Sequence, residues 1–376
     1  MATVGKRSLA SALAALCILA VCPANSFAQS GLELKAKIDE IVSRQMQAGG
    51  VVGLEIGVIN KGGQPQTFDY GEVLKRSGRM PSPSTLFQIG SITKTFTGLL
   101  LALFVERGIV RLEDPLQQYV PQGIRVPGYN GRQILLVDLA THTSGLPRNP
   151  PMKPRQYELR LEAMYALLNE AKLTREPGQK YEYSSWASAL LAEALVRVAK
   201  AEDYQALLER EVLSKLGMGE TTIRPSAVGD TRVAQGYTRG GYAAPWNLST
   251  WPAFNGGGAL YSTMGDMVKY LSFNLGLAQT SLNSVLSVVH QPRARGLTPS
   301  HNVGLAWNIS DFPKLNLTII GKEGGTLGFS SYIGLIRGEP TGVVVLANSV
   351  ATETPQIARQ ILTLLVKNRQ SSAPAP

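Results

Sequence analysis

Ser91 and Lys94 have the residue types and the spacing of a nucleophile and its base. Three residues apart at the start of a predicted helix, they would lie one turn apart on the same face. A serine hydroxyl attacks a carbonyl only when a neighbouring group helps to remove its proton, and a partly buried lysine suits this task because burial lowers its pKa. The helix N-terminus would also stabilise negative charge developing at Ser91. By itself the pair is a weak signal, because a serine N-cap with a solvated lysine produces the same string.

Other catalytic motifs are absent from the sequence. It has no G-x-S-x-G elbow, no H-E-x-x-H, no P-loop and no G-x-G-x-x-G. The sequence has only three histidines, His142, His290 and His301, which makes a zinc cluster improbable and gives few candidates for a Ser-His-Asp triad. We interpret His142 as a residue that supports the cleft by hydrogen bonds, and Gly256-Gly257-Gly258 as a tight backbone passage rather than a phosphate cradle. No metal or organic cofactor is predicted.

Further motifs accompany the Ser91 pair at intervals along the chain. They are S-I-T-K-T-F-T-G from Ser91, L-E-D-P-L from Leu112, L-A-T-H-T-S-G-L-P from Leu139, Pro177-Gly178 with Y-E-Y-S from Tyr181, Gly257-Gly258 with Y-S-T from Tyr261, and K-E-G-G from Lys322. With these motifs the sequence resembles the penicillin-recognising serine hydrolases, specifically the group of class C β-lactamases and AmpH-type D-alanyl-D-alanine carboxypeptidases. The resemblance covers nearly the whole chain beyond its N-terminal segment. The stretch from Gly123 to Gly131 is more similar to the AmpH-type peptidases.

The resemblance implies roles for several residues. Tyr183 would accept the serine proton and return it to the leaving nitrogen, and the ammonium groups of Lys94 and Lys322 would favour its phenolate form. Lys322 would also attract a substrate carboxylate. The backbone N–H groups of Ser91 and Gly325 would form the oxyanion hole, where glycine lets the backbone approach a substrate. The alternatives are a loop-anchoring aromatic at Tyr183 and an exposed edge-strand lysine at Lys322.

Two residues depart from the family pattern. Ser185 stands where the family has the asparagine of Y-x-N, and its hydroxyl reaches less far than an amide. We still place Ser185 among the substrate-binding residues. Glu323 stands where the family has the threonine of K-T-G. Strand alternation would turn Glu323 away from the face of Lys322, whereas a cleft-facing Glu323 would repel a substrate carboxylate.

The elements that would position these residues can be read from hydrophobic periodicity. Helices are expected over residues 31–47, from Ser91 to about Arg107, over residues 187–199, and after Thr354 as N-cap with Pro355 in the first turn. Strands are expected at 51–59, 66–73, 315–320, 330–336 and 342–347. They indicate an α/β (α+β) fold with an antiparallel sheet built from both ends of the chain and flanked by terminal helices. The resemblance makes this a β-lactamase/transpeptidase-like fold with an inserted, mostly helical domain.

The predicted domain boundaries follow this layout. A signal peptide is expected at 1–28, a discontinuous sheet domain at 29–88 and 305–370, a mostly helical domain at 89–304, and a disordered tail at 371–376.

The N-terminal segment has the pattern of a secretory signal. Lys6 and Arg7 precede an apolar run from Leu9 to Val21, and Ser26-Phe27-Ala28 provides a cleavage site after Ala28. The alternatives are an uncleaved anchor helix and a lipoprotein modified at Cys22, which the bulky preceding valine disfavours. Cleavage would remove both cysteines of the chain, which leaves no disulfide and no thiolate nucleophile.

Composition and charge exclude several classes of protein and of binding partner. In a chain of 376 residues, 44% hydrophobic and 17% charged residues indicate a globular protein rather than a disordered, collagenous or coiled-coil one. No apolar run reaches the length of a membrane span. The net charge of +10 would suit anionic β-lactams and anionic peptidoglycan equally, while export makes nucleic acid an unsuitable partner.

The sequence thus predicts a periplasmic or secreted serine hydrolase that works through an acyl-enzyme. β-Lactam hydrolysis is placed first, ahead of AmpH-type carboxypeptidase or endopeptidase action on peptidoglycan peptides and of ester hydrolysis. A non-turnover penicillin-binding sensor is a further alternative. The expected partners are a small β-lactam or a cell-wall peptide, and the protein is expected to be a monomer without a stable membrane span.

Overall fold

The computed structural model describes residues 24–151, 160–225, 232–244 and 252–370. Most of the predicted signal peptide and the predicted tail from Ser371 lie outside these residues. Within them, the structure contains no helix whose length and apolar character would let it cross a membrane.

The chain divides into two compact units, residues 1–40 and residues 41–376. The described part of the first unit is helical and belongs to α1 (Ala24–Gln47), which ends where the helix expected over 31–47 ends but begins earlier, before the predicted cleavage site at Ala28. The second unit contains the sheet and all the predicted site residues. The domain boundaries proposed from the sequence remain predictions.

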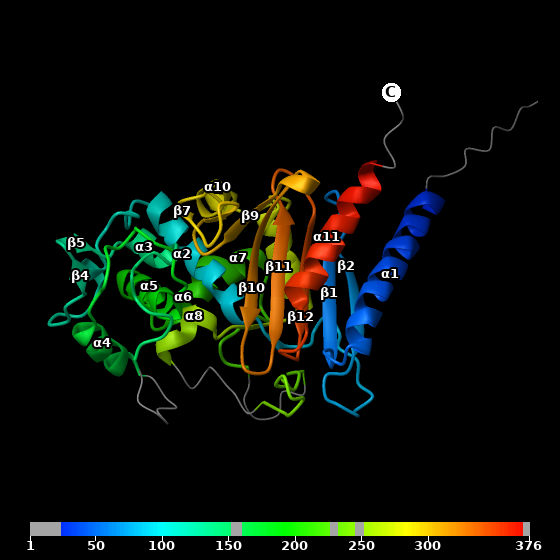
Figure 1. The fold of residues 1–376 in the computed structure, drawn as a ribbon, viewed down its shortest axis with the longest axis horizontal. Helices are drawn as coiled ribbons and strands as arrows, with labels where there is room; N and C mark the ends of the chain where they lie inside the picture. Colours follow the sequence, from blue (N-terminus) through cyan, green and yellow to red (C-terminus); the bar gives the residue numbers. More distant parts are fainter. Residues whose placement is uncertain (1–23, 152–159, 226–231, 245–251, 371–376) are drawn as a thin grey trace, which may run out of the picture. The chain divides into compact units, whose positions relative to one another are not determined.

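An eight-stranded antiparallel sheet dominates the second unit (Figure 1). Its strands, in spatial order, are β2 (Gln66–Gly71), β1 (Gly53–Ile59), β12 (Gly342–Ala347), β11 (Ser330–Ile336), β10 (Leu317–Gly325), β9 (Asn308–Phe312), β8 (His301–Val303) and β7 (Ala294–Arg295). Early and late segments meet where β1 pairs with β12, with Leu54 opposite Ala347. The predicted antiparallel sheet from both ends of the chain is confirmed. The strands β7, β8 and β9 were not predicted.

The central strands are buried on both faces. All residues of β1 and β12 are buried, and so are all residues of β11 except the first, Ser330. Helix α11 (Thr354–Gln370) packs on β11 and β12, in front of them in Figure 1, and α9 (Met264–Asn274) contacts β1 and β12. At Gly57 an added Cβ would lie 2.6 Å from Val268, so glycine allows α9 to approach the sheet.

Helix α11 forms where the sequence predicts it. It begins at Thr354 and carries Pro355 in its first turn. The sequence also predicts an apolar stripe of Ile357, Ile361, Leu364 and Leu365 on this helix, and all of these residues are buried except Leu364, which is partly exposed. Helix and sheet therefore bury one continuous apolar layer, which holds the late strands in place.

The middle of the chain is mostly helical, as predicted. Besides α9, the described helices of this part are α2 (Thr93–Glu106), α3 (Leu136–Ala140), α4 (Leu161–Glu170), α5 (Ser185–Val198), α6 (Tyr204–Leu208), α7 (Ser214–Leu216), α8 (Asn255–Gly258) and α10 (Leu286–Val289). A π-helical turn covers Glu209–Leu213, and 3₁₀ turns cover Gly90–Ile92, Leu116–Tyr119, Pro252–Phe254, Asn283–Val285 and Pro313–Leu315. Two small sheets pair β3 (Phe87–Gln88) with β6 (Tyr261–Ser262) and β4 (Gly128–Tyr129) with β5 (Arg132–Gln133).

Helix α2 is the centre of this part. All of its residues from Thr93 to Phe104 are buried, as expected of a helix surrounded by protein. It packs against α5 and α8, and Phe96 stacks on Tyr270 of α9 with ring centroids 4.0 Å apart. This packing fixes the N-terminal turn of α2, which carries the candidate nucleophile.

Candidate active site

Ser91 lies in the 3₁₀ turn Gly90–Ile92, which leads from β3 directly into α2. Gly90 precedes it with φ of +50°, and an added Cβ would lie 2.7 Å from the backbone nitrogen of Gly325. Both the positive φ and this close approach require a glycine. The turn that presents Ser91 therefore abuts the end of β10.

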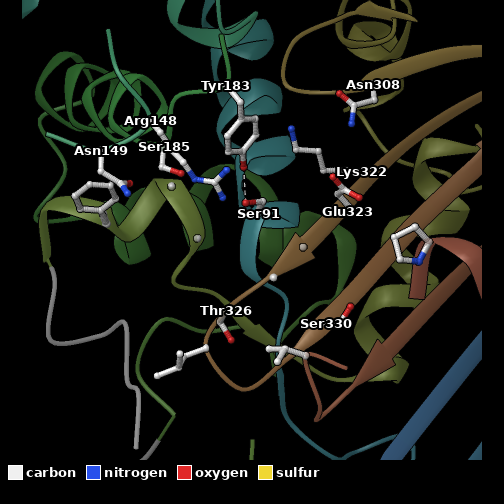
Figure 2. A pocket seen from close by; sticks show the side chains of 18 of the residues that line it. Ser91, Arg148, Asn149, Tyr183, Ser185, Asn308, Lys322, Glu323, Thr326 and Ser330 are labelled. Carbon is white, nitrogen blue, oxygen red and sulfur yellow. Dashed lines mark hydrogen bonds between the residues drawn. The ribbon is translucent and has the colours of Figure 1, made fainter. Parts of the chain in front are cut away.

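Two side chains donate hydrogen bonds to the hydroxyl of Ser91. Lys94 Nζ lies 3.0 Å from Ser91 Oγ. Tyr183 Oη lies 2.5 Å from it, and this contact is the dashed line in Figure 2. Lys94 Nζ also donates to the backbone carbonyl of Gly257, in the predicted triple-glycine passage. The structure thus brings together the three residues that the sequence places in proton transfer, although Tyr183 is 92 positions from Ser91.

Lys94 is buried, and its environment weakens its hold on a proton. Burial lowers its pKa to about 7, and the positive charge of Arg148 acts in the same direction. The neutral Lys94 amine is therefore accessible at neutral pH, and it can accept the proton of Ser91.

Lys322 is fully buried and, like Lys94, lies beside the Tyr183 ring. Lys322 Nζ and Lys94 Nζ lie 5.2 and 5.1 Å from the centroid of that ring. Burial lowers the pKa of Lys322 to about 8, with Tyr183 opposing the shift. Lys322 Nζ has no hydrogen-bond partner in the described part of the chain. A buried ammonium that borders a cavity without a partner provides a binding site for an anionic substrate group. The alternative of an exposed edge-strand lysine does not hold.

These residues surround a cavity of about 1210 Å³. Five of the predicted site residues line it, namely Ser91, Tyr183, Ser185, Lys322 and Gly325. Lys94 is buried and contacts Ser91, but it is not among the lining residues. Further charged side chains on its wall are Arg148, Lys180, Glu182, Arg239, Glu323 and Glu353.

One edge of β10 borders this cavity without a partner strand. The pairing of β10 with β9 ends at Gly321, opposite Asn308, whereas its pairing with β11 continues to Gly325. Residues 322–325 therefore pair on one side only among the described strands. An extended chain segment could pair with the other side.

Glu323 lies at the rim of the cavity. Its neighbour Lys322 is buried, whereas Glu323 is exposed, as strand alternation predicts. Glu323 shares a small cavity of about 150 Å³ with Ile319 and Gly321, which lie on its own face of β10, and with Arg359 of α11. It also lines the main cavity, so it turns away from Lys322 without leaving the mouth of the site.

Ser185 is the first residue of α5, directly after the N-cap residue Ser184. Its backbone nitrogen donates to the carbonyl of Arg148 at 2.8 Å, and its side chain lines the cavity near Arg148 (Figure 2). Its hydroxyl is in a position to contact a substrate, and the binding role stays a prediction.

Arg148 is a site residue that sequence reasoning missed. Its guanidinium lies 5.2 Å from the centroid of the Tyr183 ring, and its charge helps to lower the pKa of Lys94. It directly follows the L-A-T-H-T-S-G-L-P motif, and this adjacency is the signal that could have identified it. Asn149 and Asn308, which also line the cavity, had no such signal.

Metal-binding clusters are not found in the described ranges, where no group of three or more His, Cys, Asp or Glu side chains could hold an ion. The groups that the structure brings together at the site are the hydroxyl of Ser91, the amines of Lys94 and Lys322, the phenol of Tyr183 and the guanidinium of Arg148.

Comparisons of the sequence and of the fold with known proteins identify relatives of this chain. The family model described as Beta-lactamase matches residues 38–367. The chain is 33% identical over 333 residues to the D-alanyl-D-alanine-carboxypeptidase/endopeptidase AmpH of Escherichia coli (strain K12), covering 85% of this chain and 84% of that protein. It is 26% identical over 349 residues to a beta-lactamase of Pseudomonas fluorescens, covering 84% and 94%. The structure of a beta-lactamase/D-alanine carboxypeptidase from Yersinia pestis, complexed with citrate, matches with a TM-score of 0.74 at 29% identity, over 88% of this chain and 98% of that chain.

Proposed function

The chain belongs to the beta-lactamase family, and from this premise we propose that it is an exported serine hydrolase that forms an acyl-enzyme at Ser91. One observation carries the proposal. Ser91 Oγ accepts hydrogen bonds from both Lys94 and Tyr183 at the wall of a large cavity. A nucleophile with two proton-transfer groups in hydrogen-bond reach is the arrangement that acyl transfer requires.

Acylation follows from these contacts. Ser91 Oγ attacks the substrate carbonyl carbon, the new C–O bond forms, and the carbonyl oxygen takes the electron pair. The serine proton passes to the neutral amine of Lys94, directly or through Tyr183. When the tetrahedral intermediate collapses, the C–N bond breaks and Tyr183 delivers a proton to the leaving nitrogen. Lys94, recharged in the first step, replaces that proton on Tyr183.

The backbone amides of Ser91 and Gly325 are proposed as the oxyanion hole. The close approach of Gly90 to the Gly325 nitrogen supports this assignment, because it brings the two backbones together at the nucleophile. At Gly325 itself an added Cβ would meet no protein atom within 4 Å. Its glycine therefore leaves open space beside the backbone for a substrate.

Deacylation uses the same groups in reverse. A water molecule loses a proton to the neutral amine of Lys94 or through Tyr183 and attacks the ester carbonyl. The bond to Ser91 Oγ breaks, and the serine regains a proton as the free acid leaves. A slow water attack would convert the same site into a non-turnover penicillin-binding sensor.

β-Lactams are the first candidate substrates, as the sequence predicts. A β-lactam presents a strained amide carbonyl for Ser91 and a carboxylate for the buried ammonium of Lys322. The match to the Beta-lactamase family model over residues 38–367 supports this choice.

Peptides that end in D-alanyl-D-alanine are the second candidate. The unpaired edge of residues 322–325 favours an extended peptide, because its amides could pair with β10 while its terminal carboxylate reaches Lys322. The 33% sequence identity to the carboxypeptidase/endopeptidase AmpH also supports cleavage of such peptides.

A time course with three substrates tests the proposal. The purified protein is incubated with nitrocefin, with a D-Ala-D-Ala peptide and with a neutral p-nitrophenyl ester, while mass spectrometry records the acyl-enzyme. We expect hydrolysis of at least one amide substrate and loss of all hydrolysis in Ser91→Ala. Because loss of a nucleophile costs orders of magnitude, Ser91→Ala activity within about 10-fold of wild type would refute the proposal. A persistent acyl-enzyme without turnover would indicate the sensor.

Export is proposed from the N-terminal pattern that ends at Ala28. Cell fractionation followed by N-terminal sequencing of the exported protein should show a new terminus at Gln29. Size-exclusion chromatography of the same material tests the expected monomer.

A further inference from the structure

His142 lies behind Tyr183, outside the set of residues that line the cavity. Its side chain is completely buried. The imidazole lies against the ring of Tyr183, with centroids 4.5 Å apart, and meets the ring of Tyr181 edge-on at 5.8 Å. His142 therefore contacts the proton-transfer residue without being able to touch a substrate.

The hydrogen bonds of His142 bracket Tyr183 in the sequence. The His142 carbonyl accepts the backbone N–H of Glu182 at 2.7 Å, and His142 Nδ1 accepts the backbone N–H of Ser184 at 3.3 Å. One residue thus holds the peptide groups on both sides of Tyr183. Residues 182–184 cannot rotate without breaking one of these hydrogen bonds, and leaving a buried polar group without a partner is unfavourable.

The backbone of His142 is held in an uncommon conformation. Its φ is +59°, in the left-handed region that non-glycine residues seldom adopt. This conformation directs both its carbonyl and its ring toward residues 181–184. Neighbouring bonds maintain it, because Gly178 N donates to Thr143 O at 2.8 Å and Ser184 Oγ donates to Pro147 O at 2.8 Å. Strain of this kind persists only where the surrounding structure imposes it.

The imidazole must be neutral to make these contacts. Nδ1 can accept the Ser184 amide only when it carries no proton, so the ring proton lies on Nε2. Burial lowers the pKa of His142 well below its usual value, and the charges of Lys322 on β10 and Lys94 on α2 act in the same direction. The other titratable groups facing the ring are the phenols of Tyr181 and Tyr183.

We propose that His142 is the positioning residue for Tyr183, a buried neutral clamp that holds the phenol oxygen within hydrogen-bond reach of Ser91. The inference rests on the proposed function, in which Tyr183 moves the proton of Ser91. Because proton transfer requires heavy atoms within hydrogen-bond reach, a small displacement of the phenol slows acylation without weakening substrate binding.

A double-mutant cycle tests the clamp. His142→Phe keeps an aromatic face but removes the acceptor for Ser184, whereas His142→Asn keeps an acceptor and tolerates a positive φ. Each is made in the wild-type protein and in Tyr183→Phe, and acylation by nitrocefin is followed by stopped flow. In the wild-type background we expect His142→Phe to slow acylation by about 10-fold or more with less than about 3-fold change in KM, and His142→Asn to recover part of the loss. In Tyr183→Phe, both changes should cost less than about 3-fold.

The outcomes separate this inference from the proposed function. An equal loss from His142→Phe in both backgrounds would mean that His142 only stabilises the fold, and would overturn the clamp. Unchanged acylation in Tyr183→Phe alone would instead refute the proton-transfer role of Tyr183. Thermal unfolding of every variant checks the fold, and if His142→Phe does not fold, His142→Gln takes its place in the cycle with the same two criteria.

Discussion

At the scale of single residues, two buried lysines set the pH range of the reaction. Burial lowers the pKa of Lys94 to about 7 and that of Lys322 to about 8. We expect kcat/KM for nitrocefin to rise as Lys94 loses its proton near pH 7, because the neutral amine is the base. It should fall again above about pH 8, because Lys322 then loses the charge that attracts the substrate carboxylate. Steady-state kinetics across this range measure both limbs.

A neutral p-nitrophenyl ester provides the control. It has no carboxylate for Lys322, so its profile should keep the limb near pH 7 and lose the one near pH 8. If the ester shows the same alkaline limb as nitrocefin, Lys322 does not act through the substrate carboxylate.

Glu323 is predicted to have little influence on carboxylate-bearing substrates. Its carboxylate is exposed at the rim and on the strand face opposite Lys322, where water screens its charge. Glu323→Thr should therefore change kcat/KM for nitrocefin by less than about 3-fold. A several-fold gain on nitrocefin without a gain on the neutral ester would mean that Glu323 faces the substrate carboxylate, and would make the native protein a better esterase than β-lactamase.

Motif recognition found the residues that react but not all of those that surround them. Each of the reacting residues belongs to a recognisable string, and the structure brings them together at one place: Ser91, Lys94, Tyr183 and Lys322. Arg148 directly follows one of these strings, but only the fold shows that its guanidinium reaches the Tyr183 ring.

At the scale of elements, hydrophobic periodicity predicted the long buried strands. It predicted only part of the glycine-rich strand β10 and missed the short strands β7 and β8. The strand expected at 315–320 runs on to Gly325, because Gly321 and Gly324 serve close approach rather than a turn. An added Cβ at Gly324 would collide with the carbonyl of Ile89, and one at Gly321 would collide with Tyr332. Strands β7 and β8 have two and three residues, too few for alternation to show.

The contact between the Ser91 turn and β10 gives a prediction at this scale. Gly90→Ala adds a Cβ 2.7 Å from the Gly325 nitrogen and strains a φ of +50°. We expect it to separate the two proposed oxyanion-hole amides and to lower kcat/KM by about 10²-fold or more. It should also lower the free energy of unfolding by about 1–3 kcal/mol.

Gly108→Ala is the matched control for Gly90→Ala. Gly108 has a φ of +66°, but an added Cβ there would meet nothing within 4 Å. It should show the loss of stability that comes from a strained φ and keep full activity. If Gly90→Ala is as active as Gly108→Ala, the turn and β10 do not form the oxyanion hole together.

At the scale of the whole molecule, the site depends on segments from both ends of the sequence. β1 pairs with β12 at the centre of the sheet, and β10 presents Lys322 to the Ser91 turn. The sheet must therefore assemble before the site is complete. Anything that destabilises β1 or β2 should act on the site through the stability of the fold.

Glu55 on β1 makes this stability depend on pH. It is fully buried and lies directly opposite Asp69 of β2. Burial, reinforced by the charge of Asp69, raises the pKa of Glu55 to about 10 from an ordinary value of 4.5. Between these two values the folded protein holds a proton that the unfolded chain has lost, so the free energy of unfolding must fall as the pH rises.

Glu55→Gln should remove this dependence, because the amide cannot ionise yet has nearly the same shape. The stability gained by the variant over wild type should grow with pH, with a slope of at most about 1.4 kcal/mol per pH unit. Urea unfolding at about pH 5, 6.5 and 8 measures it, with Glu106→Gln on the exposed end of α2 as the control for the same substitution at an exposed glutamate. A constant difference for Glu55→Gln as well would mean that Glu55 ionises in the folded protein as it does in the unfolded chain. The sheet would then have to accommodate two carboxylate charges side by side, one on the buried Glu55 of β1 and one on the partly exposed Asp69 of β2.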